Sequence, residues 1–402
     1  MQKGLRSPLL PIFLIIFVGL MGFGIILPLL PLYAEVFRAK PATIGILAGS
    51  YSLAQFLVTP YFGALSDRYG RRPILIISQV GTVLSYLLLG VAGSLPVLFI
   101  ARLLDGISGG NISTAQAYIS DVTEEKDRAK AFGLIGAAFG LGFILGPAIG
   151  GLLSQGGHYG RAAFAAAALS LLSLLLTIFL LPESRTAELR KQVRQPRLID
   201  MAGVKQAFGI EQLGLLLIVF FVFTFSQAGF QSIFSLFGER RFGWGPKQNG
   251  LLLAYVGVLA VLVQGGAIGP LVRRFGERRL VQSCLLLVGA GLAMTAFVTR
   301  WPLLLLTVLP LGIGASVLTP TLNSLISRES PQRDFGWIIG LSQSAAALAR
   351  VAGPLVCGPA LQYLGTPAPL LIGAGCVVLA WVYAMRLHEP ALPASDPRFR
   401  KA

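Results

Sequence analysis

The sequence GALSDRYGRR, residues 63–72, returns as GPLVRRFGERR at residues 269–279. Among the residues of the first copy that have identical counterparts 206 positions later are Gly63, Leu65, Arg68 and Gly70. The same offset aligns Gly106 with Gly312. A repeat at about half the chain length predicts two related halves in the same order, and internal repeats of this kind are typical of membrane transporters.

Composition places both halves in a membrane. Apolar residues make up 54% of the 402 residues, charged residues only 12%, and the mean hydropathy is +0.74. Soluble domains carry about a quarter charged residues. Apolar runs of the length that a bilayer requires predict twelve spans. They are residues 9–34, 41–66, 73–93, 96–119, 131–153, 162–182, 212–237, 248–272, 280–299, 301–326, 335–363 and 367–387.

The predicted fold is an all-α membrane protein of twelve transmembrane helices in two six-helix bundles. A pseudo-two-fold axis along the membrane normal would relate the bundles, with a central site between them. The N-terminal bundle covers residues 1–182 and the C-terminal bundle residues 212–390. A cytoplasmic linker, 183–211, separates them, and a cytoplasmic tail, 391–402, follows.

The net charge of +16 would suggest a nucleic-acid partner in a soluble chain. Here the basic residues lie between apolar spans, so lipid head groups and topology explain them better, and we expect no nucleic acid. With the N-terminus inside, the inner segments hold 24 Lys and Arg residues and the outer segments 7. Both termini are therefore predicted to be cytoplasmic.

Two charges interrupt the fourth span, which lies within LPVLFIARLLDGISGGNISTAQAYISD, residues 95–121. Arg102 and Asp105 are three residues apart and share a helix face. Asp105 lies about 13 Å past Pro96, near the middle of the bilayer. A charge there costs at least about 2.5 kcal/mol and normally faces a partner or a water-filled cavity. A structural ion pair and a polar lining for a translocation path both remain open.

The first copy of the repeated loop is predicted to be a gate. Its two glycines permit a tight turn, and Asp67 is placed to meet a helix N-terminus or an arginine of the other half. Such a contact would hold the cytoplasmic side closed. A plain basic turn would explain the arginines but not the whole spacing. The predicted gating residues are Gly63, Asp67, Arg68, Gly70, Arg71 and Arg72; in the second copy, Arg273 replaces the acid.

The fifth span carries glycines at helical spacing, which make a smooth groove for a neighbouring helix, and a proline that loosens its backbone. The motif consists of Gly133, Gly142, Gly146, Pro147, Gly150 and Gly151.

These motifs resemble those of the major facilitator superfamily. Residues 63–72 match its signature loop, the fifth-span glycines resemble the motif of its drug/proton antiporters, and Arg102 with Asp105 and Gly106 resembles a third motif that usually has an amide in place of Asp105. Nearly the whole chain resembles tetracycline exporters and related bacterial multidrug efflux transporters. Gly19 stands where those tetracycline exporters carry an aspartate, which argues against a tetracycline–metal complex as substrate.

The resemblance implies export of lipophilic or amphipathic drug-like molecules in exchange for protons, by alternating access, across a bacterial inner membrane. Of seventeen acidic residues only Asp105 lies well inside a span, so Asp105 with Arg102 is the predicted proton-coupling pair. Burial disfavours a charged carboxylate and a nearby cation favours it. Arg350, the other charge inside a span, is expected either to pair with an acid or to bind an anionic substrate, with pairing the simpler expectation.

A few polar groups among aromatic and aliphatic residues suit an amphipathic ligand. The predicted substrate-binding residues are Tyr51, Gln55, Asn111, Gln116, Gln227, Gln231, Phe234, Asn323 and Gln343.

The main alternative is an importer or facilitator of a small polar metabolite, such as a sugar or an organic anion. An enzyme is not predicted, because the sequence has no paired intramembrane acids and no phosphate loop. Cys284, Cys357 and Cys376 lie in apolar runs without metal-ligand spacing, so we expect no metal and no cofactor. The expected partners of a monomeric protein are its small-molecule substrate, the proton and the lipid bilayer.

Overall fold

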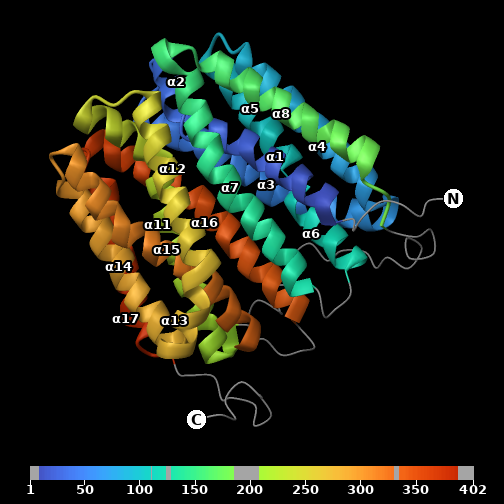
Figure 1. Ribbon diagram of the computed structural model, residues 1–402. Coiled ribbons are helices and arrows are strands. Elements are labelled where there is room, and N and C mark those ends of the chain that lie inside the picture. Colours follow the sequence, from blue (N-terminus) through green and yellow to red (C-terminus); the bar gives the residue numbers. More distant parts are fainter. Residues whose placement is uncertain (1–8, 110, 124–127, 185–207, 330–334, 388–402) are drawn as a thin grey trace.

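The computed structural model describes residues 9–109, 111–123, 128–184, 208–329 and 335–387, and all regular elements in these ranges are helices (Figure 1). Helices of the first half, blue to green, gather at the upper right of Figure 1, and those of the second half, yellow to red, at the lower left.

The helices of the first half are α1 Leu9–Ile26, α2 Leu30–Val36, α3 Pro41–Tyr69, α4 Arg71–Gly90, α5 Leu95–Ser108, α6 Asn111–Val122, α7 Arg128–Leu153 and α8 Tyr159–Leu180, with a 3-10 turn, η2 Gln155–Gly157, before α8. Those of the second half are α11 Glu211–Phe242, α12 Pro246–Leu262, the π-helical turn η3 Val263–Ala267, α13 Ile268–Phe275, α14 Glu277–Phe297, α15 Trp301–Glu329, α16 Phe335–Tyr363 and α17 Ala368–Ala384.

Ten of the described helical segments are long and apolar enough to cross a bilayer. They correspond to all the predicted spans except the fourth and the twelfth. The twelfth is the shorter α17, and the fourth is divided between α5 and α6. Large apolar side chains remain exposed on the outside of the bundle, among them Phe179, Leu262 and Leu306. Because water would penalise such a surface, it is suited to contact with lipid tails.

Three predicted spans are not the continuous helices that the sequence suggested. The first breaks between α1 and α2 at Pro28, since a proline disfavours helical geometry in the preceding residue. The fourth breaks after Ser108, where Gly109 has φ −71° and ψ 4°. In the eighth, the widened turn η3 contains Gly265 and Gly266.

The two copies of the repeated loop have the same local geometry. Gly70 has φ 108° and ψ 156°, and Gly276 has φ 75° and ψ 155°. Side chains rarely adopt positive φ, so only glycine makes this abrupt turn between consecutive helices at low cost. The tight turn predicted for this loop is confirmed at Gly70, whereas Gly63, the other glycine predicted to permit it, lies inside α3.

An ion pair follows each of these two turns, and its two charges are exchanged between the halves. In the first half Arg71 at the start of α4 pairs with Asp121 at the end of α6, at 3.0 Å. The residue 206 positions after Arg71 is Glu277, which pairs at 3.2 Å with Arg328 at the end of α15. The repeat therefore preserves the position of an ion pair and exchanges its signs.

Helix packing is dense within each half. In the first half α1 packs against α7 and α8, while α4 packs against α5 and α8. In the second half α11 packs against α16 and α17, while α14 packs against α15 and α17. The main contacts between the halves are α3 with α16 and α7 with α12. The largest apolar core draws all its buried residues from positions 213–387, and a second core comes wholly from positions 12–181.

The halves approach most closely at one end of the bundle. We call the end where α3 meets α4 the motif end and the opposite end, where α3 begins, the far end. At the far end Gly45 of α3 lies against Pro354 and Gly358 of α16, and the Ala42 amide donates to Gln362 Oε1 at 3.2 Å. Gly151 of α7 similarly lies against Gly250 of α12.

The glycines nearer the motif end have no such neighbours. Among the described atoms, a Cβ added to Gly63, Gly136 or Gly340 would have nothing within 4 Å. The joint between the halves is therefore tight at the far end and loose toward the motif end.

The far-end joint predicts opposite effects for two glycine-to-alanine changes. In Gly45→Ala the new methyl group would press on the backbone of α16, so we expect the thermal unfolding temperature in detergent to fall by at least about 2 °C. The control Gly136→Ala adds a methyl group in open space and should leave that temperature unchanged or slightly raised, because alanine favours helix. Equal effects of the two changes would contradict the tight joint.

Candidate functional site

A cavity of about 740 Å³ lies between the two halves. Most of its wall comes from α1, α3 and the other helices of the first half, while the second half contributes residues of α11 and α16. The lining runs along α3 from Ile44 near the far end to Pro60, and along α16 from Pro354 to Gly340 near its motif-end start. The cavity therefore spans much of the membrane depth.

Arg102 and Asp105 of α5 form an ion pair in this wall, with Nη1 and Oδ2 2.5 Å apart. Both residues are only 3% exposed, which makes the contact with the opposite charge essential. The Arg102 guanidinium also lies over the ring of Tyr51 on α3, 4.3 Å from its centre. Because Gly106 has no side chain, α5 approaches the α3 backbone at Tyr51 closely enough for this stacking.

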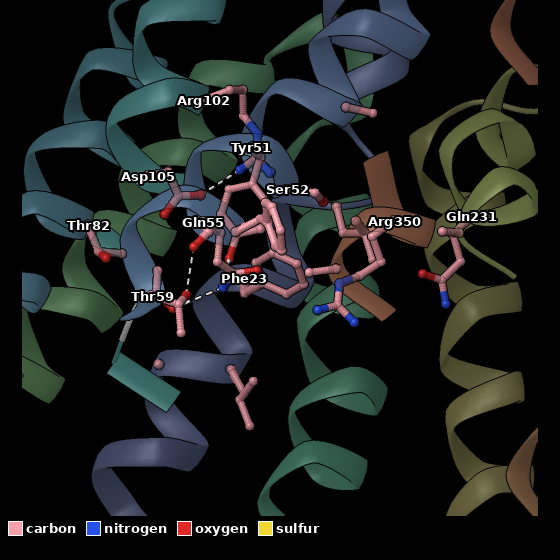
Figure 2. A pocket seen from close by; sticks show the side chains of 18 of the residues that line it. Phe23, Tyr51, Ser52, Gln55, Thr59, Thr82, Arg102, Asp105, Gln231 and Arg350 are labelled. Carbon is pink, nitrogen blue, oxygen red and sulfur yellow. Dashed lines mark hydrogen bonds and ion pairs between the residues drawn. The ribbon is translucent and has the colours of Figure 1, made fainter. Parts of the chain in front are cut away.

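Gln55, one turn after Tyr51 on α3, extends this polar wall. Its Nε2 donates to the carbonyl oxygen of Gly109 at 2.9 Å and to the Tyr51 hydroxyl at 3.2 Å. The Gly109 carbonyl is at the break between α5 and α6, where helical hydrogen bonding ends. Gln55, Tyr51, Arg102 and Asp105 thus form one connected group, seen together in Figure 2.

The second half contributes Gln231 from α11, and Gln343 and Arg350 from α16. In Figure 2 the Arg350 side chain reaches from its helix toward the side of Tyr51, with Gln231 beyond it. Arg350 is half-buried and within electrostatic reach of the Tyr51 hydroxyl. Within the described part of the chain, no acidic side chain forms an ion pair with Arg350. The cavity therefore has a neutral ion pair on one wall and a cation on the other.

A family model described as Major Facilitator Superfamily matches residues 12–268 and, separately, residues 265–402. The chain belongs to the Major Facilitator Superfamily.

Curated relatives in this superfamily cover nearly the whole chain. The protein is 34% identical over 381 residues to "Tetracycline resistance protein, class C" of Escherichia coli, covering 93% of this chain and 92% of that one. It is 30% identical over 357 residues to "Multidrug resistance protein 2" of Bacillus subtilis (strain 168), covering 85% and 86%.

Solved structures are similar over the same length. The human organic anion transporter MFSD10 (TETRAN) superposes with a TM-score of 0.71 and is 26% identical, covering 95% of this chain and 100% of that chain. The nucleoside transporter NupG has a TM-score of 0.76 at 15% identity, covering 95% of this chain and 99% of that chain. At that identity the second similarity concerns the fold alone.

The cavity brings together most of the predicted coupling and substrate-binding residues of this superfamily member. The predicted residues that line it are Tyr51, Gln55, Arg102, Asp105, Gln116, Gln231 and Gln343. The contact between Arg102 and Asp105 is confirmed; their role in coupling stays a prediction. The side chain of Asn111 and the surroundings of Gly133 lie outside what the structure describes.

Three predicted substrate-binding residues are absent from the lining: Gln227, Phe234 and Asn323. Phe234 is 1% exposed and packs against Phe230 in the apolar core, with ring centres 5.1 Å apart. Asn323 belongs to α15, a helix that contributes nothing to the lining.

The aromatic part of the wall was not predicted from the sequence. Phe23 of α1 lies between Tyr51 and Phe143 of α7, with ring centres 5.7 Å and 6.2 Å away. Both phenylalanines come from spans that are apolar on every face, so no polar stripe marks the side that faces the cavity. Their positions relative to polar residues in the sequence therefore do not indicate that they face the cavity.

In this structure the predicted gating loop makes charge contacts inside the first half. Arg71 pairs with Asp67 at 2.8 Å and with Asp121 at 3.0 Å. Glu183, just after α8, accepts hydrogen bonds from the amides of Arg71 and Arg72 at 2.9 and 3.3 Å. These amides begin α4, where a carboxylate is favoured by the helix dipole. The loop is thereby fixed to the end of α8.

Three of the fifth-span glycines form the predicted groove. Gly142, Gly146 and Gly150 of α7 lie against Leu20, Gly24 and Ile25 of α1. Gly151 and Pro147 contact α12 instead, around Gly250. One helix thereby packs against a neighbour in its own half and against the other half.

The buried ion pair predicts strong coupling between its two members. Asp105→Ala would leave a buried guanidinium, which does not lose its proton, so we expect a cost of about 3–5 kcal/mol and a marked fall in thermal unfolding temperature. The double variant Arg102→Ala with Asp105→Ala removes both charges and should unfold at a higher temperature than Asp105→Ala alone. A double variant that unfolds at no higher temperature than Asp105→Ala would contradict the pairing. Arg300→Ala, which changes an exposed arginine, provides a control.

Proposed function

We propose that this protein is a secondary active transporter that exports lipophilic or amphipathic, drug-like molecules in exchange for protons by alternating access. The observation that carries the proposal is the Arg102–Asp105 pair in the wall of a cavity shared by the two halves. An ionisable pair at membrane depth is costly and marks ion or substrate pathways. Relatives named for tetracycline and multidrug resistance support export.

The proposed architecture has twelve membrane crossings in two bundles, residues 1–182 and 212–390, with a linker at 183–211 and a tail at 391–402. The helix contacts support it. The packing of α1 on α7 and α8 has its counterpart in α11 on α16 and α17, and that of α4 on α5 and α8 in α14 on α15 and α17. Of the contacts between the halves, α3 with α16 corresponds to α12 with α7.

The proposed location is a bacterial inner membrane, with the motif end and both termini in the cytoplasm. The excess of Lys and Arg at that side, 24 against 7, supports this orientation. The loose joint toward the motif end would then be an opening to the cytoplasm. The tight far-end contacts would close the external side.

The proposed cycle uses the ion pair as the coupling element. With Asp105 protonated, a substrate that enters from the cytoplasm promotes proton release from its carboxyl group, because the ionised carboxylate then pairs with Arg102. After the far end opens, Asp105 takes up a proton from outside, and its protonation weakens the attraction to Arg102. Tyr51 and Gln55 hold Arg102 and the helix break in register while this exchange occurs. Tyr51, Gln55, Gln116, Gln231 and Gln343 are the proposed substrate contacts.

The gating loop would act in the opposite conformation. When the motif end closes, Asp67 would exchange its contact with Arg71 for a partner in the second half. The glycines near the motif end leave room for that approach.

The coupling role is tested by Asp105→Asn, which preserves size and removes the charge. In proteoliposomes, substrate-dependent proton flux and gradient-driven dye export should fall at least tenfold, while thermal unfolding shows a folded protein. Glu329→Gln, the same chemical change at the end of α15 and outside the cavity, should leave flux unchanged. Normal coupled export by Asp105→Asn would refute the assignment.

Alternating access is tested by fixing the far end. Ala42→Cys with Gln362→Cys places two thiols where α3 and α16 touch. A short bifunctional thiol reagent should cross-link the pair and stop transport, whereas each single cysteine variant treated in the same way should retain activity. Undiminished transport by the cross-linked protein would show that the far end does not need to open.

A further inference from the structure

The charges that line the cavity do not balance. Within the described part of the chain, the charged residues that line it are Arg102, Asp105 and Arg350. Arg102 and Asp105 neutralise each other at 2.5 Å, and Tyr51 covers the guanidinium face of Arg102. Arg350 is left as the net charge of the described lining. A site that carries one cation and no resident counter-ion favours a ligand that brings the missing negative charge.

A purely structural role for Arg350 would require a partner in the protein. At membrane depth an arginine normally pairs with an acid or with backbone carbonyls. Within the described residues, no carboxylate forms an ion pair with this guanidinium, and no oxygen accepts a hydrogen bond from it. The titratable group that interacts with it electrostatically is Tyr51. The neutral phenol of Tyr51 is a weak substitute for a carboxylate.

Resting on the proposed export function, we propose that Arg350 binds the acidic group of the transported molecule, and that the substrate class is an amphipathic organic anion. Arginine is suited to this role because its planar fork binds a carboxylate, sulfonate or phosphate through paired hydrogen bonds.

The rest of the cavity fits such a molecule. The rings of Phe23, Tyr51 and Phe143 form a continuous aromatic surface that accepts an apolar ring system. Gln231 of α11 and Gln343 of α16 lie in the second-half wall, and their amides supply uncharged hydrogen-bonding groups. A volume of about 740 Å³ admits a drug-sized ligand. The anion would thus place its charged end at α16 and its apolar end among α1, α3 and α7.

The test compares two probes of nearly the same shape, 1-pyrenebutyrate and 1-pyrenebutyramide, which differ by one negative charge. Binding is measured by probe fluorescence on the full-length protein in nanodiscs, with empty nanodiscs subtracted. The wild type should bind the anion at least about tenfold more tightly than the amide, as expected for a charge-assisted contact.

Arg350→Gln should abolish that preference and leave the affinity for the amide nearly unchanged, and Arg350→Lys should retain part of it. Arg300→Gln, a change of the same kind outside the cavity, should keep the full preference. If Arg350→Gln does not fold, the proposal is tested by comparing the affinities of the two probes for the wild type and for Arg350→Lys.

Equal affinities of the wild type for the two probes, no binding of 1-pyrenebutyrate, or a preference that persists in Arg350→Gln would overturn the proposal. Because the binding measurement needs no proton gradient, it is independent of export. A retained charge preference without proton-driven export would overturn the proposed function and leave the anion site standing. Proton-driven export of neutral probes without a charge preference would overturn the anion site alone.

Discussion

The contact between Arg102 and Asp105 is the constraint that organises the first half around the cavity. Each charge is tolerated at membrane depth because the other lies beside it. The missing side chain of Gly106 lets α3 lie close to α5 beside this pair. Tyr51 then reaches the guanidinium, and Gln55 reaches the broken end of α5. The buried pair and its two neighbours on α3 thus join α5 to α3.

The second constraint is the contact of glycines with neighbouring backbones. In a bilayer, helices gain little from burying apolar side chains against each other, so close van der Waals packing has to replace hydrophobic burial. Gly45, Gly151, Gly250 and Gly358 provide it at the far end, where the two halves meet. Contacts of this kind are lost completely once the helices separate slightly, because dispersion forces fall steeply with distance. A joint made in this way is suited to open and close as a unit.

Much of this arrangement was predictable because it depends on composition and periodicity. The apolar runs identified ten segments that the structure describes as membrane-length helices, and the spacing of Arg102 and Asp105 placed them on one face. The repeated glycines predicted the turn that Gly70 and Gly276 both make.

The predictions that failed concern which way a helix face points. Phe234 resembles a cavity residue in sequence but lies in the core, while Phe23 and Phe143 lie on the cavity wall. A span that is apolar all round gives no rotational signal, so only the packed structure distinguishes these positions. Hydropathy also did not locate the break at Pro28, because the apolar character continues through it.

The exchanged signs of the two ion pairs, Arg71 with Asp121 and Glu277 with Arg328, have a consequence for the ancestry of the chain. Two identical six-helix subunits related by a two-fold axis would carry the same sign at equivalent positions on both sides. Opposite signs at matched positions therefore require that the halves be encoded separately. The present distribution of charge therefore arose in a chain whose two halves could change independently of each other.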